Sequence, residues 1–191
     1  MPIGITKETL QKWYEQGVTY ADYLEKAGAK AAPWHAVGEQ AQLSVRQKEL
    51  LSSFVRTTHV LVISGVWCGD CSAQGPMLAA IAEASPAIDL RWIDRDEAVE
   101  LSNMVKINAG NRVPTVLFMA EDFEPVSIFG DRTLSRYRAI AARQLGDTCD
   151  IPGIEIPQNE FDATLQEWLN EFERVQLLLR LSGRLRQKHG D

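Results

Sequence analysis

HVLVIS, residues 59–64, is a short β-branched apolar run, which is typical of a strand buried on both faces. It leads directly into WCGDC, residues 67–71, and then into CSAQGPMLAAIAEAS, residues 71–85, which has the pattern of a helix. Proline removes a backbone donor and clashes with the preceding turn, so we expect a kink at Pro76. The sequence therefore predicts a buried strand followed by a helix whose first turn carries two cysteines.

Strands and helices alternate after this helix, which is expected to stop near Pro86. The pattern predicts a strand at 88–93, a helix at 96–106, a third strand at 113–119 and a short fourth strand at 126–129. A helix joins the first two strands, so they are expected to be parallel, whereas a short turn joins the last two, which are expected to be antiparallel. The fold class is therefore α/β, with a mixed central sheet of about four strands flanked by helices.

Extra helices are predicted before the first strand. Thr6 is placed to cap a helix that carries Leu10, and SVRQ, residues 44–47, has the form of a capping box before a second helix. AKAAPWHAVGEQ, residues 29–40, has the composition of a loop. We assign residues 1–57 to an N-terminal helical extension.

A helix is expected after Gly130 through Leu145, and a long helix from about Asn159. Apolar residues at helical spacing form a stripe on the long helix, namely Phe161, Leu165, Trp168, Leu169 and Phe172. We expect this stripe to pack on the same domain, with a dimer contact as the alternative. The chain is thus divided into the N-terminal extension, a core at residues 58–147, and a loop with a C-terminal helix at residues 148–191, all in one globular unit.

Composition argues against several classes of protein. The 191 residues carry a formal net charge of -6, which does not favour general binding to nucleic acid. No run approaches the roughly 18 consecutive apolar residues of a membrane span. The N-terminal residues lack the layout of a secretory signal, so we expect a cytoplasmic protein without membrane contact. In a reducing compartment, three cysteines indicate catalytic or free thiols rather than structural disulfides.

Cys68 and Cys71 lie on one face of the predicted helix, close enough to form a disulfide without a change in the backbone. The unpaired N–H groups at a helix N-terminus stabilise an anion, so Cys68 is expected to be the attacking thiolate. Cys71 lies one turn inside the helix and is expected to be the shielded, resolving thiol. Gly69 leaves room for a substrate backbone, and Trp67 supplies an apolar wall beside the sulfur.

Asp70 is the unusual residue of this motif. Its carboxylate suits the first turn of a helix, but its charge is expected to raise the pKa of Cys68 and to destabilise the reduced, thiolate form. A less stable reduced form has a lower potential, which favours reduction of substrates over their oxidation. Arg112 is a positive charge that offsets Asp70 if it points at the sulfur.

Together these residues resemble thioredoxin: a strand, Trp67-Cys-Gly-x-Cys71, a helix proline at Pro76, and Val113-Pro114-Thr115 at the start of a later strand. The similarity covers residues 59–145, and the WCGDC form is similar to a bacterial thioredoxin-like branch. The resemblance implies a thioredoxin-like fold and a dithiol/disulfide cycle that needs no cofactor. It also implies a cis Val113–Pro114 bond facing the two cysteines, with Thr115 beside it.

One residue departs from the thioredoxin pattern. Thioredoxins typically carry a buried acid six residues before the first cysteine, where it assists proton transfer to the resolving thiol, and this chain has Val62 there. Asp70 or water is the expected substitute. The resemblance therefore does not identify the group that assists proton transfer to Cys71.

A zinc site is an alternative interpretation of Cys68 and Cys71. A C-x-x-C is half of a zinc site, but zinc needs about four ligands. The remaining candidates, Cys149, His35, His59 and His189, offer no second paired spacing, so no metal is expected. Cys149, in the stretch GDTCDIPG, is expected to be a free thiol rather than a third redox residue.

The expected function is that of a thiol–disulfide oxidoreductase that reduces protein or small-molecule disulfides. Its partners are then those substrates and an unidentified reductant, and both a monomer and a homodimer are open. The alternative is a redox-sensing or peptide-binding module without turnover, in which the groove between Trp67 and Pro114 holds a peptide strand.

Overall fold

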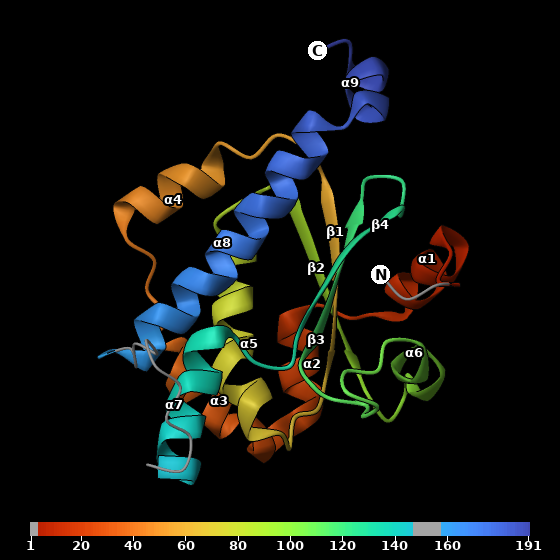
Figure 1. Cartoon of the computed structure of the whole chain (residues 1–191). Coiled ribbons are helices and arrows are strands. Elements are labelled where there is room, and N and C mark those ends of the chain that lie inside the picture. The colour runs from red at the N-terminus through yellow and green to blue at the C-terminus, as the bar shows by residue number, and fades with distance from the viewer. Residues whose placement is uncertain (1–3, 147–157) are drawn as a thin grey trace.

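The computed structural model of the chain describes residues 4–146 and 158–191 (Figure 1). In these residues a four-stranded sheet forms the centre, in the order β2-β1-β3-β4. The strands are β1 Thr58–Ser64, β2 Ile88–Asp94, β3 Thr115–Ala120 and β4 Pro125–Gly130. β1 is parallel to β2 and antiparallel to β3, which in turn is antiparallel to β4. The predicted α/β class and the predicted strand pairings are confirmed.

Helix α5, Gly69–Glu83, follows β1 and has Cys68 as its N-cap. The helix continues through Pro76. At Gly75, a Cβ atom would lie 2.2 Å from Cζ3 of Trp34. The close approach of Trp34 therefore requires a glycine at this point of α5.

Trp34 belongs to a helix that the sequence pattern did not predict. Residues 29–40 were expected to form a loop, but they contain most of a 3-10 turn, Gly28–Ala31, and the whole of α3, Ala32–Gly38. The loop prediction was wrong because Pro33 lies in the first helical turn, where its missing N–H costs no hydrogen bond. Complete burial of Trp34 then stabilises the helix against α5.

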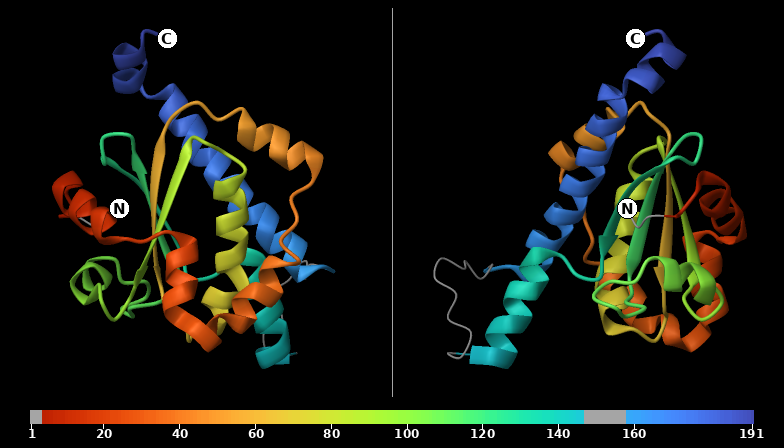
Figure 2. Two further views of the ribbon diagram at one scale, coloured as in Figure 1. Left: turned by 180° about the vertical axis from the view of Figure 1, so that it is seen from behind. Right: turned by 45° about the vertical axis from the view of Figure 1, so that its right-hand side comes forward.

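Helices cover both faces of the sheet (Figures 1 and 2). One face carries α3, α5, α2 Tyr20–Ala27 and α8 Glu160–Leu181, and the other carries α1 Lys7–Gln16 and α6 Val99–Met104. On the first face, the rings of Phe118 and Phe172 meet edge to face with centroids 5.1 Å apart. On the second, Tyr14 of α1 packs on His59 of β1 at 4.9 Å.

The remaining helices are α4 Val45–Ser52, α7 Leu134–Leu145 and α9 Gly183–His189. Three predicted helix starts are confirmed, since Thr6 and Asn159 cap α1 and α8 and Ser44 and Gln47 form the capping box of α4. Among the described residues, no helix combines the length and the apolar character needed to cross a membrane.

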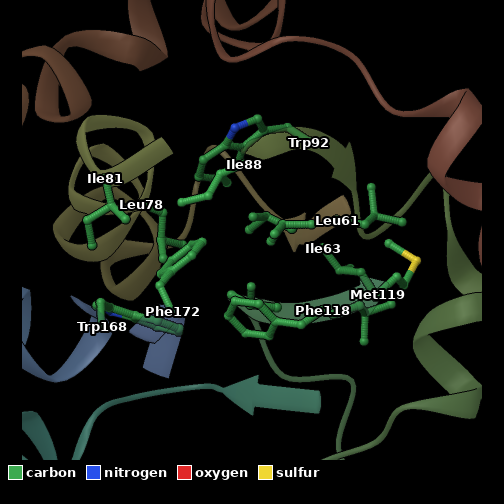
Figure 3. Close-up of a cluster of buried hydrophobic side chains, with 14 of the residues drawn as sticks. Leu61, Ile63, Leu78, Ile81, Ile88, Trp92, Phe118, Met119, Trp168 and Phe172 are labelled. Atoms are coloured by element: carbon green, nitrogen blue, oxygen red, sulfur yellow. The ribbon is translucent and has the colours of Figure 1, made fainter. Parts of the chain in front are cut away.

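The core between the sheet, α5 and α8 is closely packed (Figure 3). Its buried side chains include Leu78, Ile81, Ile88, Phe118, Trp168 and Phe172. The apolar stripe of α8 therefore packs on its own domain, as expected.

Beside this core, four aromatic residues of α2, α3 and β2 form an aromatic cluster: Tyr20, Tyr23, Trp34 and Trp92. All three predicted segments contribute to the core, but the boundary at residue 147 lies outside the described residues, so that division stays a prediction.

Candidate active site

Cys68 lies between the end of β1 and the start of α5, where its backbone N–H donates to the carbonyl of Gly65 at 2.9 Å. Its side chain is half-buried, and the thiol donates to the carbonyl of Val113 at 3.5 Å. The Val113–Pro114 peptide bond is cis, as the resemblance implies. The loop before β3 thus faces the first cysteine, as expected.

Cys71 is fully buried one turn into α5, and both cysteines are free thiols. The hydrogen bond from Cys71 is the largest influence on the pKa of Cys68 and, with the backbone N–H groups of Cys71 and Asp70, lowers that pKa to about 6 against the opposing effect of burial. Burial, followed by the proximity of Cys68, raises the pKa of Cys71 far above its usual range. At neutral pH the site therefore pairs an accessible thiolate with a buried thiol.

Asp70 is held by two arginines. Its carboxylate accepts from Arg132 Nη2 at 2.6 Å and from Arg136 Nη2 at 2.8 Å, and Arg136 also pairs with Glu160 at 3.2 Å. Asp70 does raise the pKa of Cys68, as expected, but more weakly than the hydrogen-bond donors lower it. The negative charge of Asp70 is therefore paired with two guanidinium groups.

Arg112 was expected to offset Asp70 only if it pointed at the sulfur, and the structure gives it another partner. Its guanidinium instead donates to Asp131 at 3.0 Å. Asp131 is buried just after β4, and it also accepts from the Tyr137 hydroxyl. Burial opposes ionisation of this carboxyl, but the hydrogen bonds from Tyr137 and Arg112 lower its pKa overall. A second ion pair thus lies next to the one that holds Asp70.

Gln74 connects this polar region to the C-terminal helix. It is fully buried in α5, its Nε2 donates to the backbone carbonyl of Asp131 at 2.9 Å, and its Oε1 accepts from Trp168 Nε1 at 3.1 Å. Four residues of this region were not predicted from the sequence, namely Gln74, Asp131, Arg132 and Arg136. Their partners are distant in sequence, so no local pattern marks them.

Three other predicted residues border the cysteines. Trp67 is about half exposed, and its ring lies over Gly65 and under the Arg95 guanidinium, which is 4.5 Å from the ring centroid. A Cβ atom at Gly69 would meet no atom within 4 Å, so the space beside Cys68 is open there. Thr115 is buried, and its hydroxyl donates to the Arg112 carbonyl at 2.7 Å, which fixes the loop before β3.

Cys149 lies outside the described residues, and its predicted role stays a prediction. In the described parts of the chain, no group of three or more histidine, cysteine or acidic side chains is arranged to hold a metal ion. Val62 is fully buried in β1, so its position supplies no acid to the site.

Several solved structures are similar to this chain. A protein of unknown function from Pseudomonas aeruginosa is 19% identical, with a TM-score of 0.63 over 86% of this chain and 95% of that chain. An HIV epitope scaffold is 17% identical, with a TM-score of 0.61 and the same coverage. Oxidised thioredoxin O2 from Arabidopsis thaliana is 18% identical and covers 52% of this chain and 86% of that chain, with a TM-score of 0.33.

At the level of sequence, no curated protein matches the chain. A family model described as thioredoxin matches residues 17–142, a range that contains Cys68, Cys71 and Pro114. Because this match covers most of the chain, the protein belongs to the thioredoxin family.

Proposed function

We propose that the protein is a thiol–disulfide oxidoreductase that reduces disulfides of proteins or small molecules. One observation carries the proposal: a half-buried Cys68 whose pKa is lowered to about 6 is hydrogen-bonded to a fully buried Cys71. Thiolates, not thiols, attack disulfides, so Cys68 is active at neutral pH while Cys71 stays protonated until it is needed. Family membership supports a redox role but names no substrate.

The reaction has two exchanges. The Cys68 thiolate attacks one substrate sulfur, the substrate S–S bond breaks, and its electron pair leaves on the other substrate sulfur, which takes up a proton. Cys71 then attacks the Cys68 sulfur, which releases the second substrate sulfur as a thiolate and leaves a Cys68–Cys71 disulfide. A thiol reductant restores the dithiol, and we propose the cytoplasm as the compartment that supplies it.

The surroundings of Cys68 suit an extended substrate. The Val113 carbonyl lies beside the sulfur, the space at Gly69 is open, and the Trp67 ring forms an apolar wall. These features support strand-like pairing of a peptide with the loop before β3. A protein disulfide in an extended segment is therefore the favoured substrate.

The direction of the reaction follows from the acidity of Cys68. In proteins with C-x-x-C, the attacking thiol has a pKa from about 3.5 in strong oxidants to about 7 in reductants. A pKa of about 6 for Cys68 lies nearer the reductant end. The charge of Asp70 alone does not set the direction, because Arg132 and Arg136 pair with it.

The test is catalysed reduction of a protein disulfide such as insulin with an excess of a small thiol reductant. We expect turnover by the wild type and by Cys149→Ser, and none by Cys68→Ser. Cys71→Ser is expected to stop turnover and to leave covalent partners on Cys68, which mass spectrometry identifies. Partners trapped without any turnover of the wild type would contradict the enzyme and favour the peptide-binding or redox-sensing module. Equal loss of activity in Cys149→Ser would add a third thiol to the mechanism.

A further inference from the structure

Two buried hydroxyl groups lie behind Cys71 without a hydrogen-bond partner. Among the described residues, Ser64 Oγ and Tyr23 Oη are enclosed and make no hydrogen bond of normal geometry. Ser64 is fully buried at the end of β1, and Tyr23 is buried in α2. A buried polar group without a partner costs free energy, so two beside a redox-active pair require an explanation.

The sheet register brings these residues to one face. Val62 lies beside Trp92 and Ser64 lies beside Asp94 in the parallel pair of β1 and β2, and side chains two apart on a strand share a face. Tyr23 stacks on Trp92 with centroids 5.6 Å apart and planes at 29°. The Ser64 and Tyr23 side chains therefore lie on the same face of the sheet, the face that α2 and α5 cover.

The position of Ser64 affects Cys71 directly. Burial and the adjacent Cys68 raise the pKa of Cys71, whereas the Ser64 hydroxyl and the backbone N–H of Gly65 act in the opposite direction. The Ser64 hydroxyl acts on Tyr23 as well, where it opposes the rise in the tyrosine pKa that burial causes. Ser64 thus lies between the resolving thiol and the tyrosine.

The resolving thiol has a chemical problem that this arrangement addresses. Cys71 is fully buried and must lose its proton to attack the mixed disulfide on Cys68. The position in β1 where thioredoxins carry a buried acid is occupied here by the apolar Val62, which takes up no proton. Asp70, one of the two expected substitutes, is held in ion pairs with Arg132 and Arg136.

We propose that the hydroxyl groups of Ser64 and Tyr23 form the proton path from Cys71 to solvent, an inference that rests on the proposed thiol–disulfide exchange. A pocket of about 520 Å³ gives the path an exit, and its lining includes Tyr23, Val66, Trp92 and Asp94. The pocket lies at the C-terminal end of β2, beside the strand end that carries Ser64.

In this step, Cys71 resolves the mixed disulfide on Cys68 and gives up its proton. The Cys71 sulfur bonds to the Cys68 sulfur, and the bond between Cys68 and the substrate sulfur breaks, with its electron pair leaving on the substrate as a thiolate. Cys71 is oxidised and the substrate sulfur is reduced. The Cys71 proton passes to Ser64 Oγ while the Ser64 proton passes to Tyr23 Oη, and the Tyr23 proton passes to a water molecule that enters from the pocket.

The test separates the two exchanges with the chromogenic disulfide dithiobis(nitrobenzoate), in stopped flow and in a Cys149→Ser background. Attack by Cys68 releases one coloured thiolate, and resolution by Cys71 releases the second. Nitrothiobenzoate is a weak base, so it does not take the Cys71 proton itself. We expect Ser64→Ala and Tyr23→Phe to leave the first phase unchanged and to slow the second by roughly 10-fold to 100-fold.

The variants also change how the second phase depends on pH. Without the hydroxyl path the proton must leave to hydroxide, so the rate of the second phase is expected to rise more steeply with pH than in the wild type. Ser64→Thr keeps a hydroxyl and is expected to restore the rate.

Tyr20→Phe is the matched control for Tyr23, because Tyr20 lies in the same helix and also packs on Trp92, with ring centroids 5.2 Å apart. Ser85→Ala is the control for Ser64, since Ser85 is another buried hydroxyl without a partner in the described chain.

The outcomes are distinguishable. A second phase with the wild-type rate and pH profile in Tyr23→Phe, which keeps the aromatic ring and therefore the fold, overturns the proton path. Equal slowing by Tyr20→Phe or Ser85→Ala also overturns it, because the effect would then be one of packing. A background protein in which Cys68 releases no coloured thiolate, or in which the second phase survives Cys71→Ser, contradicts the proposed function instead.

Discussion

The carboxylate of Asp70 accepts a hydrogen bond from Arg136 at 2.8 Å, although 66 positions separate the two residues. Arg132 binds the other carboxylate oxygen at 2.6 Å. The acidic residue between the two cysteines is therefore one half of an ion pair that joins the start of α5 to α7 and the turn before it. Substitution of Asp70 removes one charge and also releases two arginines beside the redox site.

Asp70→Asn is expected to lower the pKa of Cys68 further and to raise the reduction potential. Both effects of the substitution favour the thiolate, since the carboxylate opposes it and the released guanidinium groups attract it. The potential is expected to rise by roughly 30 mV or less, because solvent and salt screen the charges. Ultraviolet titration of the thiolate and equilibration with a glutathione buffer measure the two quantities. Glu100→Gln, in α6, is the control for a change of net charge, and an unchanged or lower potential in Asp70→Asn contradicts the argument.

The rate of alkylation of Cys68 is expected to depend on pH with a midpoint near the pKa of about 6. Only the thiolate reacts, so the rate rises about tenfold per pH unit below the midpoint and becomes level above it. Iodoacetamide with mass spectrometry follows each cysteine separately. Cys71 is expected to remain unmodified throughout, because it is buried and its pKa is raised. A midpoint in the alkaline range of ordinary thiols would show that the helix donors do not act on Cys68.

Gly75→Ala is expected to destabilise the protein by about 1–3 kcal/mol, the usual cost of overpacking a core. The new methyl group would overlap Trp34, which is fully buried and is held by its hydrogen bond to Val66. Gly69→Ala in the same helix is the control, since its methyl group enters open space and helix propensity favours alanine by up to ~1 kcal/mol. Urea denaturation compares the free energies of unfolding. Equal stability of the Gly75→Ala variant would mean that α3 is displaced at little cost.

Gln74→Leu is expected to cost about 1–3 kcal/mol, because it leaves the Asp131 carbonyl and the Trp168 indole N–H buried without their partner. Trp168→Phe removes the indole N–H and leaves Gln74 Oε1 unpaired. The double variant lacks both groups, so its loss of stability should be smaller than the sum of the two single losses. Thermal unfolding of the four proteins measures this coupling, and strictly additive losses would contradict a direct bond between the two residues.

The strands, the cysteine-bearing helix and the pair Cys68 and Cys71 were predictable because each has a local signal. A β-branched run marks β1, and a spacing of three residues marks the pair. The cis Val113–Pro114 bond was predicted from the family resemblance rather than from any local pattern.

The parts that were missed depend on contacts between distant residues. Helix α3 looked like a loop because its stability comes from Trp34 packing on α5, which no local propensity records. The two arginines that bind Asp70 come after β4 in the chain, and the sheet register is what places Tyr23 and Ser64 on one face. Arg112, two residues before Pro114, was the cation expected to offset Asp70 if it pointed at the sulfur, but it binds Asp131 instead.

The aromatic cluster of Tyr20, Tyr23, Trp34 and Trp92 has an optical consequence. The Trp34 and Trp92 rings are 5.7 Å apart and nearly perpendicular, and both are fully buried, so their electronic transitions couple in a fixed chiral arrangement. Such coupling produces near-ultraviolet circular dichroism, which disappears when tertiary packing is lost. The cluster lies on the same face of the sheet as Ser64, so the protein carries a label-free spectroscopic reporter of the region behind its resolving thiol.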